Sequence, residues 1–122
     1  MVPSANVQQL IDAIESMEEG IALFDADDRL VVCNETYRGA FQSAAPQVVP
    51  GETFETILRA LATNGLVSGA DGREEEWIAK RLAEHRQPSR PLKQYLADGR
   101  YLQINEYQTQ AGGTVAIQTD IT

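Results

Sequence analysis

The chain has 122 residues, 43% of them hydrophobic, and a formal net charge of -8. This length suits one compact domain that buries roughly two thirds of the surface its unfolded form exposes, and no apolar run approaches the ~20 residues of a membrane helix. The acidity argues against binding to nucleic acids or anionic lipid surfaces. The N-terminus lacks the basic and apolar segments of a secretory signal, and a lone Cys33 cannot form an internal disulfide. We therefore expect a cytoplasmic protein.

Residues 1–18 are predicted to form an N-terminal flanking helix. Apolar residues recur at steps of three and four from Val7 to Met17, which places them in one stripe. This spacing suits packing on the chain's own domain and pairing with a second copy equally well. We divide the chain into this flanking helix and one domain at residues 19–122.

Two short strands and a helix are predicted next. Ile21–Phe24 and Leu30–Cys33 form a hairpin around the acidic turn at residues 25–28, because aspartate bonds nearby backbone amides and tolerates the left-handed region. Asn34 follows where a side-chain oxygen can cap a helix that begins at Glu35.

Two helices are predicted in the middle of the chain, after a loop at residues 46–51. Thr53 opens the first, and Asn64 and the glycine after it end it. The second spans residues 73–86, with an acidic start and a basic end that match the helix dipole. Trp77 either anchors this helix to the core or forms a wall of a ligand cleft.

The last third of the chain is predicted to be three strands, at Leu92–Ala97, Tyr101–Gln110 and Thr114–Ile121. Asp-Gly at residues 98–99 and Gly-Gly at residues 112–113 supply the positive φ that tight hairpins need. Two strands, three helices and three strands indicate an α+β protein, in which an antiparallel sheet carries the helices on one face.

Four segments together resemble a PAS domain. They are the stretch GIALFDADDRLVVCNETY at residues 20–37, the Asp-Gly turn, the Gly-Gly turn and the terminal Asp-Ile-Thr. The likeness covers about Ile11 to Thr122 and is strongest to the subclass found in bacterial sensor histidine kinases and cyclases. Asp28 departs from it, since many relatives place glycine there. Because aspartate tolerates the left-handed region, we expect the turn to persist.

The resemblance implies a PAS fold, with a five-stranded antiparallel sheet in the order 2-1-5-4-3 and the helices on one face. It also implies a ligand-sized cleft between the sheet and the helices that follow the second strand. A homodimer through the N-terminal helix and the outer sheet face is implied as well.

Neither a flavin nor a haem is expected, and the cofactor, if the domain has one, is unknown. Flavin-binding photosensors of this family carry a reactive cysteine in a helical Asn-Cys-Arg type motif, whereas Cys33 ends a strand and is interpreted as a small buried apolar residue. His85 follows Leu82 at helical spacing and could reach a haem. We expect instead a partly exposed histidine, favoured by the helix C-terminus.

Catalysis and metal binding are not predicted. The aspartates at residues 25, 27 and 28 lack the spacing, the glycine and the distal glutamate of a calcium loop. One histidine, no glycine-framed serine and no Walker-type loop leave no nucleophile with a base. A small α+β enzyme would need an acid and a base that converge in its pocket, and we cannot assemble that pair.

The sequence therefore predicts a cytoplasmic sensory domain of a bacterial signal-transduction protein of histidine kinase or cyclase type. It would bind a small ligand, or relay a conformational change, to a C-terminal effector that this chain does not include. The alternative is a ligand-free dimerisation scaffold, whose own side chains fill the cleft. The candidate cleft residues are Trp77, Ile78 and Leu82 on the helix and Leu102 and Ile104 on the strands.

The candidate signal relay lies at the end of the last strand. Asp120 is expected on the polar face of this strand, beside Thr122, where the chain would leave for an effector. Arg29, at the start of the second strand, is a candidate partner for the Asp120 carboxylate. An exposed ion pair contributes at most about 1 kcal/mol to folding. The expected role of this pair is therefore to fix the angle at which an output helix leaves the domain.

Overall fold

The fold, a computed structural model, is described for residues 4–88 and 91–122. Its five strands are Gly20–Phe24 (β1), Leu30–Cys33 (β2), Leu92–Tyr95 (β3), Tyr101–Gln108 (β4) and Thr114–Asp120 (β5). They form one antiparallel sheet in the order β2-β1-β5-β4-β3. The predicted α+β class and the strand order implied by the resemblance are therefore confirmed.

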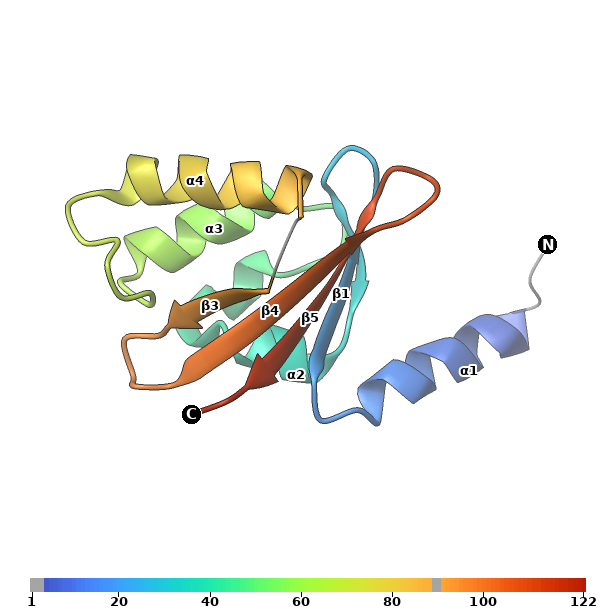
Figure 1. The fold of residues 1–122 in the computed structure, drawn as a ribbon. Helices are drawn as coiled ribbons and strands as arrows, with labels where there is room; N and C mark the ends of the chain where they lie inside the picture. The colour runs from blue at the N-terminus through green and yellow to red at the C-terminus, as the bar shows by residue number, and fades with distance from the viewer. Residues whose placement is uncertain (1–3, 89–90) are drawn as a thin grey trace.

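The helices divide into three that cover the sheet and one that leaves it. Helices α2 (Glu35–Gly39), α3 (Phe54–Thr63) and α4 (Glu74–Arg86) gather on one face, together with the short 3₁₀ helix η1 (Gln42–Gln47). Helix α1 (Ser4–Glu15) extends away from the body from a point beside the start of β1 (Figure 1). The apolar stripe predicted on α1 begins at Val7, whose side chain lies outside the described residues.

The boundaries differ from the prediction in the loops. Helix η1 occupies part of a segment for which we predicted only a loop, with Pro46 inside it. Strand β3 ends at Tyr95 rather than Ala97, because the Leu96 amide already bonds Arg100 in the turn and the Ala97 amide bonds Leu66. Short 3₁₀ segments and strand ends depend on such tertiary partners, which sequence periodicity does not record.

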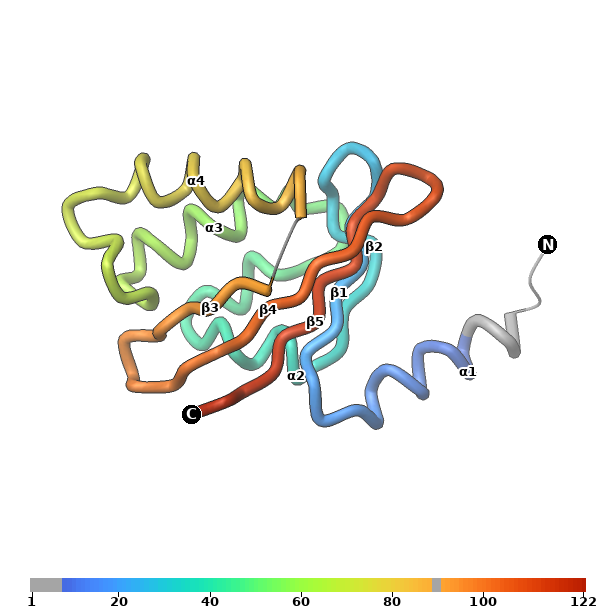
Figure 2. The backbone as a smooth tube through the Cα atoms, viewed as in Figure 1, coloured from blue at the N-terminus to red at the C-terminus, as the bar shows by residue number. Residues whose placement is uncertain are grey.

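The two hairpin turns, β1–β2 and β4–β5, lie side by side (Figure 2). Asp28 adopts the left-handed conformation with φ of 59°, so the expected survival of this turn without glycine is confirmed. Asp25 Oδ1 holds the turn by accepting from the amides of Asp27 and Arg29, at 2.9 and 3.0 Å. On the other hairpin, a Cβ at Gly113 would lie 2.3 Å from the Phe24 carbonyl oxygen. Only glycine allows the strands to approach this closely.

The hydrophobic core fills the space between the sheet and helices α2–α4. Each large side chain buried there stabilises the fold by about 1.5–3 kcal/mol. Its most deeply buried apolar members are Ala22, Phe24, Leu30, Tyr37, Ala44, Val48, Ile57, Leu58, Val67, Ala70 and Ala116. On β5 the inward face carries Thr114 and Ala116, while the more apolar Val115 and Ile117 point outward and are half-buried.

Asn34 joins α1 to the domain. Its Oδ1 caps α2 by accepting from the Tyr37 amide at 3.0 Å, as predicted, and also accepts from the Ile21 amide at 2.9 Å. Its Nδ2 donates to the carbonyl oxygens of Ile14 at 2.7 Å and Glu19 at 2.9 Å. One fully buried amide thus satisfies backbone groups of α1, β1 and α2 together.

Candidate functional site

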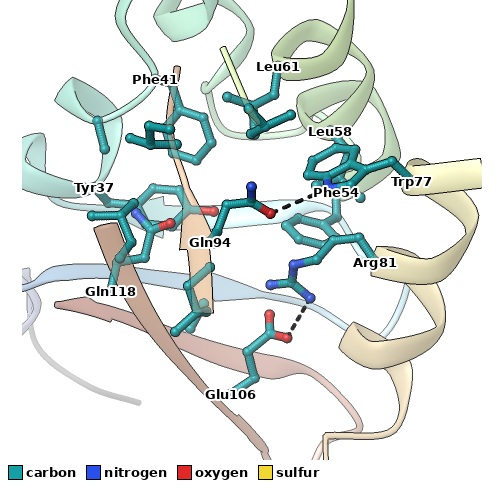
Figure 3. A pocket seen from close by; sticks show the side chains of 16 residues that line it. Tyr37, Phe41, Phe54, Leu58, Leu61, Trp77, Arg81, Gln94, Glu106 and Gln118 are labelled. Carbon is teal, nitrogen blue, oxygen red and sulfur yellow. Dashed lines mark hydrogen bonds and ion pairs between the residues drawn. The ribbon is translucent and has the colours of Figure 1, made fainter. Parts of the chain in front are cut away.

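A cavity of about 40 Å³ lies between the inner face of the sheet and the helices (Figure 3). Its walls are mainly apolar and come from α2, α3, α4 and strands β3, β4 and β5. The lining residues are Tyr37, Ala40, Phe41, Phe54, Leu58, Leu61, Val67, Trp77, Arg81, Gln94, Leu96, Leu102, Ile104, Glu106, Ala116 and Gln118. Apolar walls with a few convergent polar groups are typical of small-molecule sites.

The structure places three of the five candidate cleft residues at this cavity. Trp77, Leu102 and Ile104 line it, whereas Ile78 and Leu82 are buried in the hydrophobic core and are not among its lining. Helix periodicity explains the difference, because residues four apart share a face and the next residue is rotated by about 100°. The face of α4 that reaches the cavity therefore carries Trp77 and Arg81.

Trp77 combines the two roles considered for it. The ring is partly buried against the core and also forms one wall of the cavity. Its Nε1 donates to Gln94 Oε1 on β3 at 3.3 Å, across the space between helix and sheet (Figure 3). A single contact thus holds α4 to an edge strand beside the cavity.

The polar lining was not predicted. Gln94, Glu106 and Gln118 face the cavity from three adjacent strands. The Gln118 Nε2 is buried and finds no hydrogen-bond partner among the described residues. Strand alternation puts Gln118 on the same face of β5 as Asp120, the face expected to be polar, but only the fold shows that this face is turned inward.

A buried charged cluster lies beside the cavity, at the C-terminal half of α4. Glu106 accepts from Arg81 Nη1 at 2.9 Å and lies 2.7 Å from His85 Nδ1. The other ring nitrogen, His85 Nε2, is 3.4 Å from Asp28 Oδ1 in the β1–β2 turn. These contacts tie helix α4 to strand β4 and to the hairpin turn.

The expectation of a partly exposed His85 is wrong, since its side chain is fully buried. The ring stacks on Phe54 at a centroid distance of 3.9 Å and meets Phe24 edge-on at 5.3 Å. The last turn of α4 lies over these aromatic side chains, and Glu106 is the hydrogen-bond partner of Nδ1. Nε2 lies 3.4 Å from Asp28 Oδ1 but makes no hydrogen bond with the described residues.

Burial and charge act in opposite directions on the Glu106 carboxyl. Burial alone raises its pKa, but the hydrogen bond with His85 and the charge and hydrogen bond of Arg81 outweigh it, so the pKa lies below its ordinary value. Glu106 is therefore ionised at neutral pH. Burial also raises the pKa of the Tyr37 hydroxyl at the cavity wall, which stays protonated.

Comparison with known families assigns this architecture. A family model described as PAS fold matches residues 14–122. The chain belongs to the PAS family. The PAS domain thus covers the whole sheet and helices α2–α4, and its match begins near the end of α1.

A relative and two solved structures show how this PAS domain compares with others. The "non-motile and phage-resistance protein" of Caulobacter vibrioides is 34% identical over 116 residues, which cover 93% of this chain and 12% of that protein. The chain therefore spans about an eighth of the length of that relative.

Both solved structures share the fold at low identity. A domain of a sensory box sensor histidine kinase/response regulator from Geobacter sulfurreducens has a TM-score of 0.50 at 20% identity, over 95% of this chain and 93% of that one. The PAS domain of the RpfR quorum-sensing receptor from Cronobacter turicensis, in complex with BDSF, has a TM-score of 0.54 at 15% identity, over 89% of this chain and 99% of that one.

Asp120 and Thr122, the residues of the predicted relay, bond to each other at the end of the domain. Asp120 Oδ1 accepts from the Thr122 amide at 3.0 Å and from the Thr122 hydroxyl, and these bonds lower its pKa. Thr122 Oγ1 in turn accepts from the Tyr101 amide at 2.9 Å. The Asp-Ile-Thr ending therefore fastens the chain to the start of β4.

Arg29 is not the partner of Asp120. Along the β1–β5 ladder, Phe24 pairs with Thr114 and Gly20 with Gln118, which puts the β1–β2 turn and Asp120 at opposite ends of the sheet. Arg29 Nη1 instead donates to the Gly51 carbonyl oxygen at 2.7 Å. The sequence placed both residues at strand ends but did not reveal which end of the sheet each occupies.

Other candidate centres were also located. Cys33 is half-buried, and burial raises its pKa to about 11, so its thiol is protonated at neutral pH. In the part of the chain that the structure describes, no group of three His, Cys, Asp or Glu side chains is placed to hold a metal ion. None of the described helices has the length and apolar character needed to cross a membrane.

Proposed function

We propose that this PAS domain is the sensory module of a cytoplasmic bacterial signalling protein of histidine kinase or cyclase type. It binds a small molecule in the cavity between α4 and the sheet, and passes the change through β5 to a C-terminal effector. The domain itself is not catalytic. The observation that carries this proposal is the cavity, with apolar walls and the polar groups of Gln94, Arg81 and Gln118 turned toward it.

The route from cavity to exit is short. Gln118 lines the cavity and lies two residues before Asp120, which fastens the end of β5. Between them, Thr119 Oγ1 donates to Glu19 Oε2 at 3.0 Å, in the segment that joins α1 to β1. A ligand that moves β5 would therefore reach the entering helix and the departing chain at one place. It shifts the two states only as far as it prefers one of them.

The relatives support this proposal at the level of their own descriptions. One solved domain with this fold is part of a sensor histidine kinase/response regulator, and another was determined in complex with BDSF. The chain spans about 12% of its curated relative, which leaves most of that protein for other domains.

Native mass spectrometry of the purified domain tests the sensory role. We expect a bound small molecule that is lost in Ala116→Leu, a variant that fills the cavity from the buried floor of β5. Ala40→Leu, also at the lining but directly after α2, serves as a second filling variant if Ala116→Leu does not fold. A domain without bound molecule that also shows no response to a metabolite library contradicts ligand binding.

We also propose a homodimer that uses α1 and the outer sheet face. Leu10 on α1 is 64% exposed, and Tyr107 on the outer face of β4 is 56% exposed, which is more apolar surface than a solvated helix and strand usually show. Light scattering on the chain with and without residues 1–18 measures this. A full-length chain that is monomeric at micromolar concentration contradicts the dimer.

A ligand-free dimerisation scaffold is the second candidate. The small volume of the cavity favours it, because about 40 Å³ holds only about three water molecules and the domain's own side chains occupy the rest of the cleft. A stable dimer that carries no bound molecule and keeps full signalling in Ala116→Leu would support this candidate.

A further inference from the structure

A second hollow of about 110 Å³ lies beside the cavity, between α4 and β3. It shares four lining residues with the inner cavity, Trp77, Arg81, Gln94 and Ile104. The remaining residues of this second hollow, which we call the mouth, are Lys80, Glu84, Leu92 and Lys93. Cavity and mouth thus adjoin across these four shared side chains, with mainly apolar walls around the inner hollow and charged residues around the outer one.

From this arrangement we propose that the site selects a short amphiphilic anion, with its apolar chain in the cavity and a carboxylate at the mouth. The inference rests on the proposed ligand-binding function and names the chemical class of the ligand. It depends on three features, which are the cations of the mouth, the Arg81 guanidinium and the size of the cavity.

Three cationic side chains line the mouth, although the chain as a whole has a net charge of -8. Lys80 and Lys93 are the only lysines of the sequence, and both line this hollow. In the described part of the chain neither lysine pairs with a carboxylate, whereas Arg38, Arg59, Arg73, Arg81, Arg86 and Arg100 all do. Among the described residues that line the mouth, Glu84 is the one acidic residue. The two lysines can therefore attract an anion without first breaking an ion pair.

Arg81 lines both the mouth and the cavity and can contact the carboxylate at their junction. It donates to Glu106 through Nη1, and its other nitrogens have no hydrogen-bond partner among the described residues. A guanidinium offers five donors in a planar fork, which suits a second carboxylate. The second oxygen of Glu106 is held by His85, so Glu106 keeps a partner while Arg81 is shared with the ligand.

The cavity limits the length of the apolar chain. Its volume of about 40 Å³ corresponds to about three water molecules, and a methylene group takes about as much space as a water. An apolar chain of roughly three or four carbons, as in pentanoate beyond its carboxylate, fits with small side-chain movements. The inner walls between Phe41, Leu58 and Leu61 offer this chain only apolar contacts.

The inference is tested by titrating the ¹⁵N-labelled domain with pentanoate, 1-pentanol and pentylamine at low ionic strength. We expect pentanoate to bind most tightly and to shift the side-chain amide signals of Gln94 and Gln118. The double variant Lys80→Gln/Lys93→Gln should weaken the binding of pentanoate about three- to tenfold, which is the scale of exposed charge pairs. It should change the affinity for 1-pentanol by less than about twofold. Added salt should reduce the difference.

Two further sets of variants test where the ligand's carboxylate and its apolar chain bind. Arg59→Gln/Arg73→Gln removes two exposed cations away from the mouth and should leave pentanoate binding within about twofold of the parent. Ala116→Leu, or Ala40→Leu if the first variant does not fold, should abolish the binding of all three probes.

Each contrary result separates this inference from the function on which it rests. If the domain binds pentanoate and 1-pentanol with equal affinity, or if the loss of both lysines leaves the pentanoate affinity unchanged, the ligand is not an anion. Ligand binding in the cavity would still stand. Pentanoate binding that survives cavity filling places the anion on the surface and overturns the inference. If a metabolite found by native mass spectrometry binds but none of the three probes does, the ligand class is wrong and the sensory function stands.

Discussion

The two ends of the sheet are held by different kinds of contact. At the end with the β1–β2 turn, the Glu106 and His85 side chains are almost completely buried, and their contacts join a strand, a helix and the turn. At the opposite end, where α1 enters and β5 leaves, the buried Asn34 amide holds α1. The other contacts there are exposed or partly buried hydrogen bonds, such as Asp120 to Thr122 and Thr119 to Glu19. A buried charged network is costly to disturb, whereas exposed hydrogen bonds open at little cost.

This difference would allow one small domain to act both as the receptor and as the relay that we propose. The cavity lies between the two ends, and its lining includes Arg81 and Glu106 from the rigid cluster and Gln118 from β5. The ligand that we propose would therefore meet walls that are fixed on one side. On the other side, β5 leads directly to the end where a small rearrangement reaches the chain termini. The following predictions test the contrast, from the largest expected effect to the smallest.

Removing the charge of Glu106 should be the most damaging single change. Glu106→Gln leaves Arg81, which is 10% exposed, without its carboxylate, and should reduce the free energy of unfolding by about 3 kcal/mol. Urea denaturation measures this, with Glu84→Gln at a half-buried position of α4 as the control of equal charge change. A loss below about 1 kcal/mol would show that the cluster does not stabilise its end of the sheet.

Asn34→Ala should have the next largest effect, because it leaves four backbone groups without their partner. We expect a loss of about 2 kcal/mol in the free energy of unfolding, and faster proteolysis in the segment between α1 and β1. Asn64→Ala, at the exposed end of α3, is the matched control. Unchanged proteolysis in Asn34→Ala would mean that this amide does not hold α1 to the domain.

The Glu106 carboxyl also predicts a pH dependence. Because its pKa is lowered in the folded state, its contribution is fully present above the ordinary value of 4.5 and is lost as the pH falls through the folded pKa. The stability difference between the parent and Glu106→Gln should therefore be constant near neutral pH and shrink below about 4.5. A difference that stays unchanged in acid contradicts the assignment of the ionised form to Glu106.

The smallest effects on stability are expected at the exit end. Thr119→Val removes the bond to Glu19 and should cost about 1 kcal/mol or less, and Asp120→Ala should barely change the melting temperature. In a chain that carries its effector, both variants should nevertheless alter basal output. Normal output together with a normal ligand response in both variants would remove the relay from this end of the sheet.

The sequence predicted most of the fold because its turns and caps are local. The Asp-Gly and Gly-Gly turns, the left-handed Asp28 and the cap by Asn34 all depend on residues close in the chain. Helix η1 was missed, since its polar sequence carries no helical period. The face of β5 was also not assigned, because the outward Val115 and Ile117 are more apolar than the inward Thr114 and Gln118.

The site was less predictable than the fold. Trp77, Leu102 and Ile104 were found because large apolar residues at helix and strand spacing tend to face inward. The cluster of Arg81, Glu106 and His85 joins residues up to 25 positions apart, and nothing in the sequence pairs them. The same limit applied to Asp120, whose bond to Thr122 is local and whose distance from Arg29 is set by strand register.

Amide hydrogen exchange in the parent and in Thr119→Val tests the central claim most directly, because it measures the two ends separately in one experiment. At the exit end, the Ile21 amide donates a hydrogen bond to the Asn34 side chain, and the Ile121 amide donates one to the Tyr101 carbonyl oxygen. At the rigid end, the Leu30 amide donates to the Glu52 carbonyl oxygen, and the Phe54 amide donates to the Asp28 carbonyl oxygen. We predict that Thr119→Val speeds exchange at Ile21 and Ile121 and leaves Leu30 and Phe54 at the rate of global unfolding. Equal acceleration at all four amides would show that the sheet opens as one unit, and would contradict a relay confined to the exit end.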